Sequence, residues 1–197
     1  MSDKIFNDLL KKYCDALIEL RQLKNNTEIS QVVDLILKKQ GKLIFSGIGK
    51  SAHICKKSAA TFSSLGISSF FIHATEASHG DLGMIDENDI LFFVSNSGET
   101  SEMKDIVCFA KKNKILSVGI SKNSESFLAK NVNFFIQLSM PELLDDILAP
   151  TISTTCTLVL LDLIACSVAK KQSFTVHDYG RLHPGGNLGE VARNIKK

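Results

Sequence analysis

Two short polar loops in the sequence combine glycine with side chains that bind anions. They are Ser46-Gly47-Ile48-Gly49-Lys50-Ser51 and Ser95-Asn96-Ser97-Gly98-Glu99-Thr100. The second loop places three hydroxyls directly before an expected helix, whose first turn presents unpaired N–H groups and partial positive charge. One polar residue is enough to cap a helix, and this loop has more than that role requires. The pattern therefore predicts a site for a phosphate monoester.

The first loop has to be distinguished from two nucleotide-binding loops. A Walker A loop needs a glycine five positions before Gly49, and Ile44 stands there. The glycine spacing of a dinucleotide-binding loop is present, but the acidic residue expected at the end of the next strand is not, since the first carboxylate, Glu76, comes late. A tight strand-to-helix turn explains the glycines alone and leaves Lys50 and Ser51 unexplained.

Several titratable residues lie in or next to polar loops and could act on a molecule bound at these turns. Moving a proton between adjacent carbons of a sugar phosphate, through an enediol, needs a base and an acid but no nicotinamide and, in principle, no metal. Each candidate is also an ordinary surface residue when taken singly. The candidates from position and type are His79, Glu102, Glu142, the pair Asp145-Asp146, and His183.

Composition limits the class of protein that can hold these residues. With 197 residues, 44% of them hydrophobic and 22% charged, the chain suits one globular domain, residues 1–197. The net charge of +2 is spread along the chain, which argues against nucleic acid and anionic membranes as partners. The first residues indicate an amphipathic helix rather than the apolar core of a secretory signal, and five cysteines without a CxxC pair favour a reducing compartment. We therefore expect a cytoplasmic protein without a membrane span.

The periodicity of apolar residues predicts the elements that position the loops. Residues 4–40 contain two amphipathic helices, which we expect to pack on a sheet domain. Short runs that are apolar on both faces then alternate with helices, as in a parallel sheet covered on both sides. A later helix, residues 151–171, is apolar nearly all round, which predicts a core helix that a partner subunit also covers. The fold class is thus α/β, doubly wound, with a mostly parallel sheet of five strands flanked by helices, at residues 42–46, 69–72, 90–94, 116–120 and 134–138.

The loops, taken together, resemble the sugar isomerase (SIS) domain of arabinose 5-phosphate isomerases. Besides the two glycine-containing loops, the resemblance rests on three further segments between about Leu43 and Gly189. These are Glu76-Ala77-Ser78-His79-Gly80-Asp81-Leu82-Gly83-Met84, Leu148-Ala149-Pro150-Thr151-Ile152-Ser153-Thr154-Thr155 and His183-Pro184-Gly185-Gly186-Asn187-Leu188-Gly189.

The resemblance implies conversion of D-ribulose 5-phosphate to D-arabinose 5-phosphate for Kdo in lipopolysaccharide or capsule. Because the sequence has no cluster of metal ligands and the dinucleotide-binding pattern lacks its acidic residue, we expect no metal or redox cofactor. The resemblance also implies a homotetramer with active sites between subunits. The implied catalytic set is Lys50, Glu102, Glu142 and His183, with His79 close to them. The implied phosphate- and substrate-binding residues are Gly47, Ser51, Ser95, Asn96, Ser97, Thr100, Ser153 and Thr154.

Two departures from the family pattern leave alternatives open. Family members often continue into a paired CBS module, which this sequence does not contain. The segment around Glu142 is unusually acidic, so that Asp145 or Asp146 could take the role of Glu142. The alternative functions are a phosphosugar sensor without catalysis and an isomerase for another sugar phosphate. A sensor needs the anion-binding loops but not the acid–base set.

Overall fold

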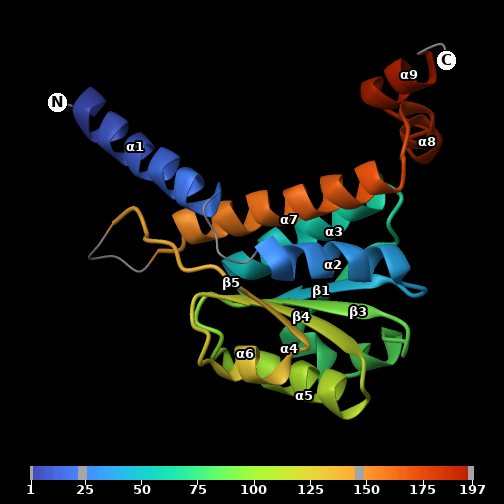
Figure 1. Ribbon diagram of the computed structural model, residues 1–197, viewed down its shortest axis with the longest axis horizontal. Helices are drawn as coiled ribbons and strands as arrows, with labels where there is room; N and C mark the ends of the chain where they lie inside the picture. The colour runs from blue at the N-terminus through green and yellow to red at the C-terminus, as the bar shows by residue number, and fades with distance from the viewer. Residues whose placement is uncertain (1, 22–25, 145–148, 195–197) are drawn as a thin grey trace.

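A parallel sheet of five strands lies between two layers of helices (Figure 1). The computed structural model describes residues 2–21, 26–144 and 149–194. The strand order is β2-β1-β3-β4-β5, and all four neighbouring pairs are parallel. The strands are β1 (Leu43–Gly47), β2 (Ser69–His73), β3 (Ile90–Val94), β4 (Leu116–Ser121) and β5 (Phe134–Gln137). These bounds confirm the predicted α/β class and agree with the predicted strands to within one residue at each end.

Each face of the sheet has its own layer of helices and its own hydrophobic cluster. One layer contains α2 (Asn26–Lys38), α3 (Lys50–Ser64) and α7 (Ile152–Lys171); the other contains α4 (Ala74–Ala77), α5 (Lys104–Lys112) and α6 (Phe127–Asn131). On the α3 side, the rings of Phe45 and Phe92 stack at 4.9 Å between centroids, with Phe62 tilted against both. The buried strands need apolar residues on both faces, which explains their continuous apolar runs.

The carboxyl ends of the strands meet at one edge of the sheet. Gly47 at the end of β1 is in register with His73 on one side and Val94 on the other. The chain therefore leaves β1 toward β2 and later returns to place β3 on the opposite side. Ligands of open parallel sheets bind at such a switch point, outside the carboxyl ends.

Helix α7 is the core helix of one layer. It is 20 residues long, and by length and composition alone it could cross a membrane. However, 56% of its most apolar window is buried, and Leu160, Leu161, Ile164 and Val168 pack in the cluster on the α3 side of the sheet. Leu163 on its outer face is 57% exposed. We therefore interpret α7 as a core helix with one uncovered stripe.

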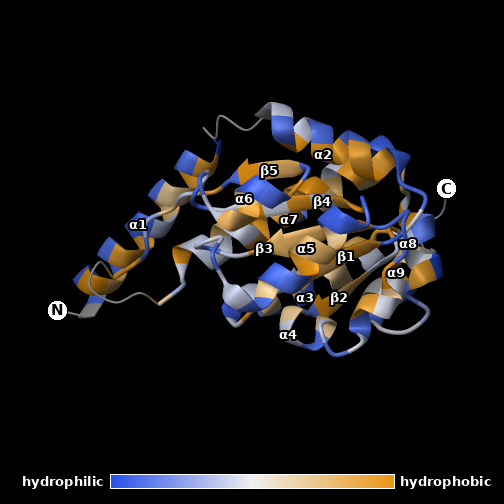
Figure 2. Cartoon of the chain, turned by 90° about the horizontal axis from the view of Figure 1, so that it is seen from below, coloured by the Kyte–Doolittle hydropathy of each residue, from blue (hydrophilic) through white to orange (hydrophobic). Residues whose placement is uncertain are grey.

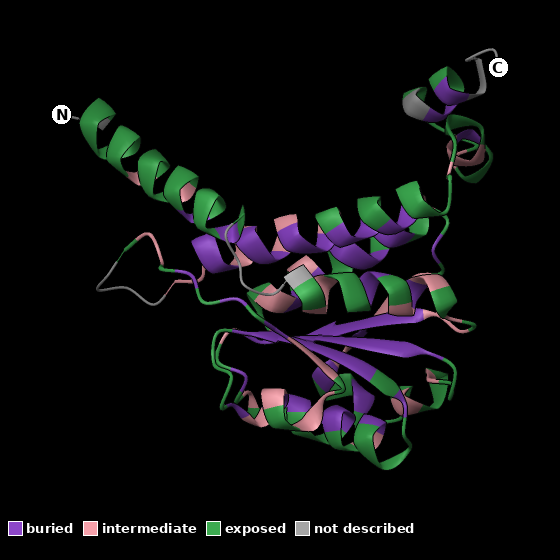
Figure 3. Ribbon diagram, in the orientation of Figure 1, coloured by how far each residue is buried: buried purple, intermediate pink, exposed green. Residues whose placement is uncertain are grey.

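Helix α1 (Ser2–Arg21) projects from the body of the domain, and its apolar residues are largely uncovered (Figures 2 and 3). Within its described part, only Ala16 and Leu20, near its carboxyl end, are buried. The exposed apolar residues are Ile5, Phe6, Leu10, Leu17 and Ile18, with Phe6 the most exposed at 67%. Of the two helices expected to pack on the sheet domain, α2 does so along its length and α1 mainly at one end.

The end of the chain contains two helices that periodicity does not predict. They are α8 (Val176–Leu182) and α9 (Asn187–Asn194), which pack on each other beyond the carboxyl end of α7. Local chemistry starts α8: Thr175 accepts a hydrogen bond from the N–H of Asp178, and Asp178 accepts one from the N–H of Thr175. This reciprocal pair is a capping box.

Replacing Asp89 by Ala should lower the free energy of unfolding by about 2–4 kcal/mol, because two N–H groups and an ammonium would lose a shared partner. Its buried carboxylate accepts hydrogen bonds from the N–H of Lys42 at 2.6 Å and of Asp86 at 2.8 Å, and it pairs with Lys42 Nζ at 3.2 Å. Urea unfolding measures the change. Asp86→Ala, which keeps the Asp86 N–H, is the control, and an equal loss in both variants would contradict this role.

Candidate active site

The turn after β1 brings the start of α3 close to the sheet edge. Gly49 has φ 59° and ψ −129°, a conformation that favours glycine. A Cβ at Gly47 would lie 3.1 Å from the carbonyl carbon of Ser51 and 3.2 Å from the carbonyl oxygen of Val94, so this close approach also favours glycine. Helix α3 starts at Lys50, and no side chain caps its first turn. Its N–H groups are thus directed to the sheet edge without a side-chain acceptor from the cap position.

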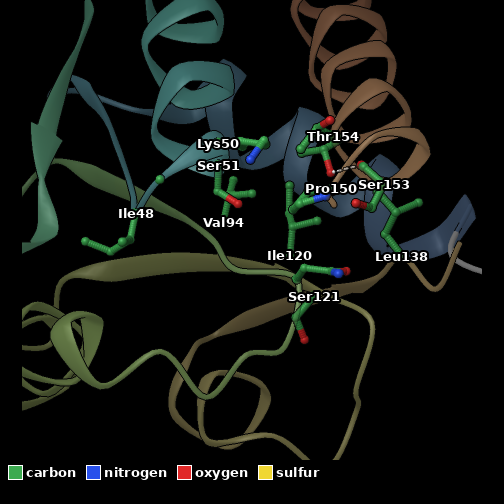
Figure 4. A pocket seen from close by; sticks show the side chains of 13 residues that line it. Ile48, Lys50, Ser51, Val94, Ile120, Ser121, Leu138, Pro150, Ser153 and Thr154 are labelled. Atoms are coloured by element: carbon green, nitrogen blue, oxygen red, sulfur yellow. Dashed lines mark hydrogen bonds between the residues drawn. The ribbon is translucent and has the colours of Figure 1, made fainter. Parts of the chain in front are cut away.

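A cavity of about 250 Å³ opens beside this turn, between the starts of α3 and α7 (Figure 4). Its walls come from the carboxyl ends of β1, β3, β4 and β5 and from the first turns of α7. Its lining residues are Ile48, Gly49, Lys50, Ser51, Val94, Asn96, Ile120, Ser121, Leu138, Pro150, Ser153, Thr154 and Thr157. Five of the residues predicted from the sequence thus line one cavity: Lys50, Ser51, Asn96, Ser153 and Thr154.

The electrostatics of this cavity favour an anion. The cap position of α7, Thr151, makes no side-chain capping hydrogen bond, as at α3. Two helix N-termini therefore face the cavity, and each is equivalent to roughly half a positive charge. At α7 the carboxylate of Glu142 accepts the N–H of Thr151 and offsets this charge, so the end of the cavity that favours an anion is the start of α3. The ammonium of Lys50 adds a full charge from the first residue of α3.

Glu142 lies at the start of α7, next to the cavity wall. Its Oε2 accepts hydrogen bonds from the N–H of Thr151 at 2.8 Å and from Thr151 Oγ1 at 2.9 Å. Burial raises the pKa of this carboxyl group, but the hydroxyl and N–H of Ser153 and the N–H and hydroxyl of Thr151 together outweigh burial, and the pKa lies below its ordinary value. Glu142 is therefore ionised at neutral pH. Its alternatives, Asp145 and Asp146, lie outside the described residues.

Ser153 connects Glu142 to the cavity. Its side chain is buried, lines the cavity, and lies close enough to Glu142 to lower the pKa of that carboxyl group. The separation does not meet the geometry of a hydrogen bond: within the described chain, Ser153 Oγ and Glu142 Oε1 are both buried without a hydrogen-bond partner. Buried polar atoms are usually paired, so these two oxygens indicate a place for a ligand or water.

The turn after β3 keeps its hydroxyls in local hydrogen bonds. Ser95 Oγ accepts from the N–H of Gly98 at 3.0 Å and is 2.9 Å from Thr100 Oγ1, while Ser97 Oγ accepts from the N–H of Glu99 at 3.1 Å. The side chain of Ser95 is buried and that of Ser97 is exposed. The predicted helix after Thr100 starts with a 3-10 turn, Ser101–Met103, before α5. Only Asn96 of this turn lines the cavity.

Glu102 and His79 lie at the same sheet edge but outside the cavity lining. Glu102 is exposed in the 3-10 turn, where a hydrogen bond from Ser101 Oγ at 2.7 Å lowers the pKa of its carboxyl group. His79 is exposed in the loop that follows β2 and α4. Ser78, its neighbour, donates a hydrogen bond to Asp105 of α5 at 3.0 Å, so this loop is tied to the element that follows Glu102.

His183 lies at the opposite end of the domain. Its ring stacks on Tyr179 at 3.8 Å, its Nδ1 is 2.8 Å from the carbonyl oxygen of Tyr179, and its Nε2 is 3.4 Å from Ser64 Oγ. Ser64 is the last residue of α3, whereas Lys50 is its first. A helix of this length spans roughly 20 Å, so the structure does not bring His183 to the cavity of its own chain.

Some residues at the site were not found from the sequence. Thr157 and Ser121 line the cavity, and Thr151 binds Glu142. Thr157 follows Ser153 by one helical turn, a spacing that could have identified it once α7 was expected to start at the cavity. Across the part of the chain that the structure describes, no group of three His, Cys, Asp or Glu side chains could hold a metal ion.

Comparisons with known proteins give relatives over nearly the whole chain. Arabinose 5-phosphate isomerase KdsD of Yersinia pestis is 43% identical over 176 residues, which are 89% of this chain and 53% of that protein. Arabinose 5-phosphate isomerase KpsF of Escherichia coli is 41% identical over 175 residues, or 88% of this chain and 54% of that protein. The chain spans about half the length of the curated relatives it matches.

A solved structure matches the fold over nearly all of both chains. A protein of E. coli CFT073, in complex with arabinose 5-phosphate, has a TM-score of 0.88 and 34% sequence identity, with 92% of this chain and 96% of that chain covered. The family model of the SIS domain matches residues 36–167. Since this match runs from the end of α2 into α7 and includes every strand of the sheet, the chain belongs to the SIS domain family.

Proposed function

We propose that this chain is an aldose–ketose isomerase that interconverts D-ribulose 5-phosphate and D-arabinose 5-phosphate. The observation that carries the proposal is an ionised carboxylate, Glu142, beside a cavity suited to an anion, at the carboxyl edge of the sheet. The names of the curated relatives and the arabinose 5-phosphate bound to the structural relative support this substrate. The product would supply Kdo for lipopolysaccharide or capsule.

The reaction needs only proton transfer. A base removes the proton from C2 of the open-chain aldose while the aldehyde oxygen gains a proton, which gives the enediol. A proton then enters at C1 while the hydroxyl at C2 loses one, which gives the ketose. No oxidant or reductant is consumed. We assign the acid and base roles to Glu142, Glu102, His79 and His183, and the role of Lys50 is to stabilise negative charge that develops on the sugar oxygens.

Electrostatics suggest how the sugar phosphate is oriented. A phosphate next to the ionised Glu142 would be repelled, whereas the start of α3 and the turn after β3 favour it. We therefore assign the phosphate to the residues of these two turns, and the sugar end to Ser153 and Thr154 on α7. The proposed phosphate residues are Gly47, Ser51, Ser95, Asn96, Ser97 and Thr100.

The position of His183 supports an oligomer. If His183 takes part in the reaction, it has to act on the cavity of another subunit, because α3 separates it from its own. The exposed apolar residues of α1 and the exposed stripe of α7 offer surface for such contacts. We propose a cytoplasmic homotetramer with active sites between subunits.

An NMR assay in D₂O tests the activity directly. Purified protein mixed with ribulose 5-phosphate should yield arabinose 5-phosphate, and exchange through the enediol should place solvent deuterium on the carbon that is protonated. Calorimetry with arabinose 5-phosphate separates binding from turnover. Tight binding without conversion would identify a sensor instead of an enzyme, and conversion of a different sugar phosphate alone would correct the substrate.

Dialysis against a chelator should leave the isomerase activity unchanged. The proposed steps use proton transfer by side chains, and none of the described His, Cys, Asp and Glu residues form a metal-binding group. Activity before and after exhaustive dialysis is compared in metal-free buffer. A loss that only an added divalent cation reverses would contradict the proposed chemistry.

A further inference from the structure

Thr151 stands at the cap position of α7 but does not cap the helix. A threonine at this position ordinarily accepts a hydrogen bond from an N–H group of the first helical turn. Here the side chain of Thr151 makes no such bond; instead its hydroxyl donates to Glu142 Oε2 at 2.9 Å. The N–H of Thr151 donates to the same oxygen at 2.8 Å. Both donors of Thr151 thus bind Glu142.

The arrangement also fixes the direction of the Thr151 hydroxyl. Leu143 directly follows Glu142 in the chain, and its N–H donates a hydrogen bond to Thr151 Oγ1 at 3.3 Å. Because a lone pair of Thr151 Oγ1 accepts the N–H of Leu143, the hydroxyl proton points to the carboxylate of Glu142 and is donated to it. The residue therefore holds the segment of Glu142 at two points, the backbone of Leu143 and the carboxylate itself.

One oxygen of Glu142, Oε2, accepts both of these hydrogen bonds. The N–H and the hydroxyl of Ser153 lie close enough to Glu142 to lower the pKa of its carboxyl group, but neither makes a hydrogen bond of ordinary geometry to the other oxygen, Oε1. Glu142 Oε1 is buried and has no partner among the residues that the structure describes. Ser153 Oγ, which lines the cavity, is also buried without a hydrogen-bond partner among the described residues. A buried acceptor without a hydrogen bond destabilises a folded protein. If Thr151 only attached the loop to α7, there would be no reason for Glu142 Oε1 to remain buried and unpaired.

We propose that Thr151 is a positioning residue, which holds Glu142 through Oε2 so that Oε1 is presented to the substrate as the proton acceptor. This inference rests on the proposed isomerase function, in which Glu142 takes part in proton transfer. Because Glu142 is ionised, Oε1 can only accept, so the group that it meets is a donor such as a sugar hydroxyl or an acidic C–H.

The other titratable groups around Glu142 are few in the described part of the chain. Cys156 lies in the second turn of α7, and the pKa of its thiol is raised first by burial and then by the charges of Glu142 and Glu19. On α1, Glu19 acts on the same thiol, and Lys12 Nζ donates to the carbonyl oxygen of Leu143 at 3.0 Å. Any change in the pH dependence of a Thr151 variant has to be compared with these groups.

Three substitutions on α7 test the proposal. Thr151→Val keeps the shape and the N–H but removes the hydroxyl donor, and should lower kcat about tenfold with little change in KM, since a hydrogen bond to a charged group is lost. Thr151→Ser keeps both donors and should retain activity close to that of the parent protein. Thr155→Val is the matched control, because it removes a hydroxyl that bonds the carbonyl oxygen of Thr151 at 3.1 Å without bonding Glu142.

A second readout does not depend on turnover. Carbon-13 NMR of the side-chain carboxyl of Glu142 follows its titration, which should move to higher pH in Thr151→Val and stay in place in Thr151→Ser and Thr155→Val. An unchanged titration in Thr151→Val, or equal loss of activity in all three variants, would overturn the positioning role. A shifted titration in a protein that does not convert ribulose 5-phosphate would support the hold on Glu142 and contradict the proposed function alone.

Discussion

Glu142→Gln should lower kcat by a factor of roughly 10²–10⁴, the usual contribution of a general base. Glutamine has nearly the same shape and keeps an oxygen to accept from Thr151, so the segment should stay in place. The substitution removes the carboxylate that accepts the proton, but it leaves the contacts that bind the phosphate in the ground state unchanged. We expect KM for arabinose 5-phosphate to change little, as steady-state kinetics can measure.

The corresponding controls are Asp145→Asn and Asp146→Asn, the two neighbouring carboxylates that the sequence offers as alternatives. A fully active Glu142→Gln variant together with an inactive Asp145→Asn or Asp146→Asn variant would move the role to that aspartate.

The pH profile of the activity gives a further check on Glu142. Since the pKa of Glu142 lies below its ordinary value of 4.5, protonation of this group can reduce kcat/KM only below about that pH. A loss of activity that begins near neutral pH therefore belongs to another group, such as a histidine.

Mixing two inactive chains should restore activity if His183 serves the cavity of another subunit. A His183→Ala chain has an intact cavity, and a Glu142→Gln chain has an intact histidine. When they are unfolded together and refolded in equal amounts, about one quarter of the sites combine both intact residues, if subunits associate at random and each site has one donor of each kind. Activity per chain should then approach about one quarter of that of the parent protein.

The control for this experiment replaces the Glu142→Gln partner by a chain with both substitutions. That mixture can form no complete site and should stay inactive. Native mass spectrometry shows whether mixed oligomers form in either case. Mixed oligomers of the two single variants that form but remain inactive would show that His183 does not complete a neighbouring site, and a monomer in solution would exclude the arrangement altogether.

The sequence predicts the sheet of this protein well because each strand is buried by helices on both faces. Apolar side chains are then required at every position, and a short continuous apolar run such as Ile90–Val94 marks a central strand without ambiguity. The short elements are less visible. Helices α8 and α9 have too few turns to show a period, and they are stabilised by their contact with each other.

The site likewise contains residues that the sequence could group and residues that it could not. Positions at the carboxyl ends of predicted parallel strands must share one edge, so Lys50, Ser51 and Asn96 could be grouped from the sequence. Residues that follow long connections could not. The hydrogen bonds between Glu142 and Thr151 depend on how the chain between β5 and α7 returns to the start of that helix, a path that no local preference defines.

The amino-acid sequence by itself determined the α/β class, the strands, the two glycine-containing turns and the resemblance to sugar isomerases, because these depend on local patterns of burial and turn geometry. The tertiary structure decided which candidates meet. It places the cavity between the starts of α3 and α7, pairs Glu142 with Thr151, and sets His183 beside Ser64 at the far end of α3. These outcomes depend on where distant segments pack against one another, and side-chain spacing along the chain contains no information about that distance.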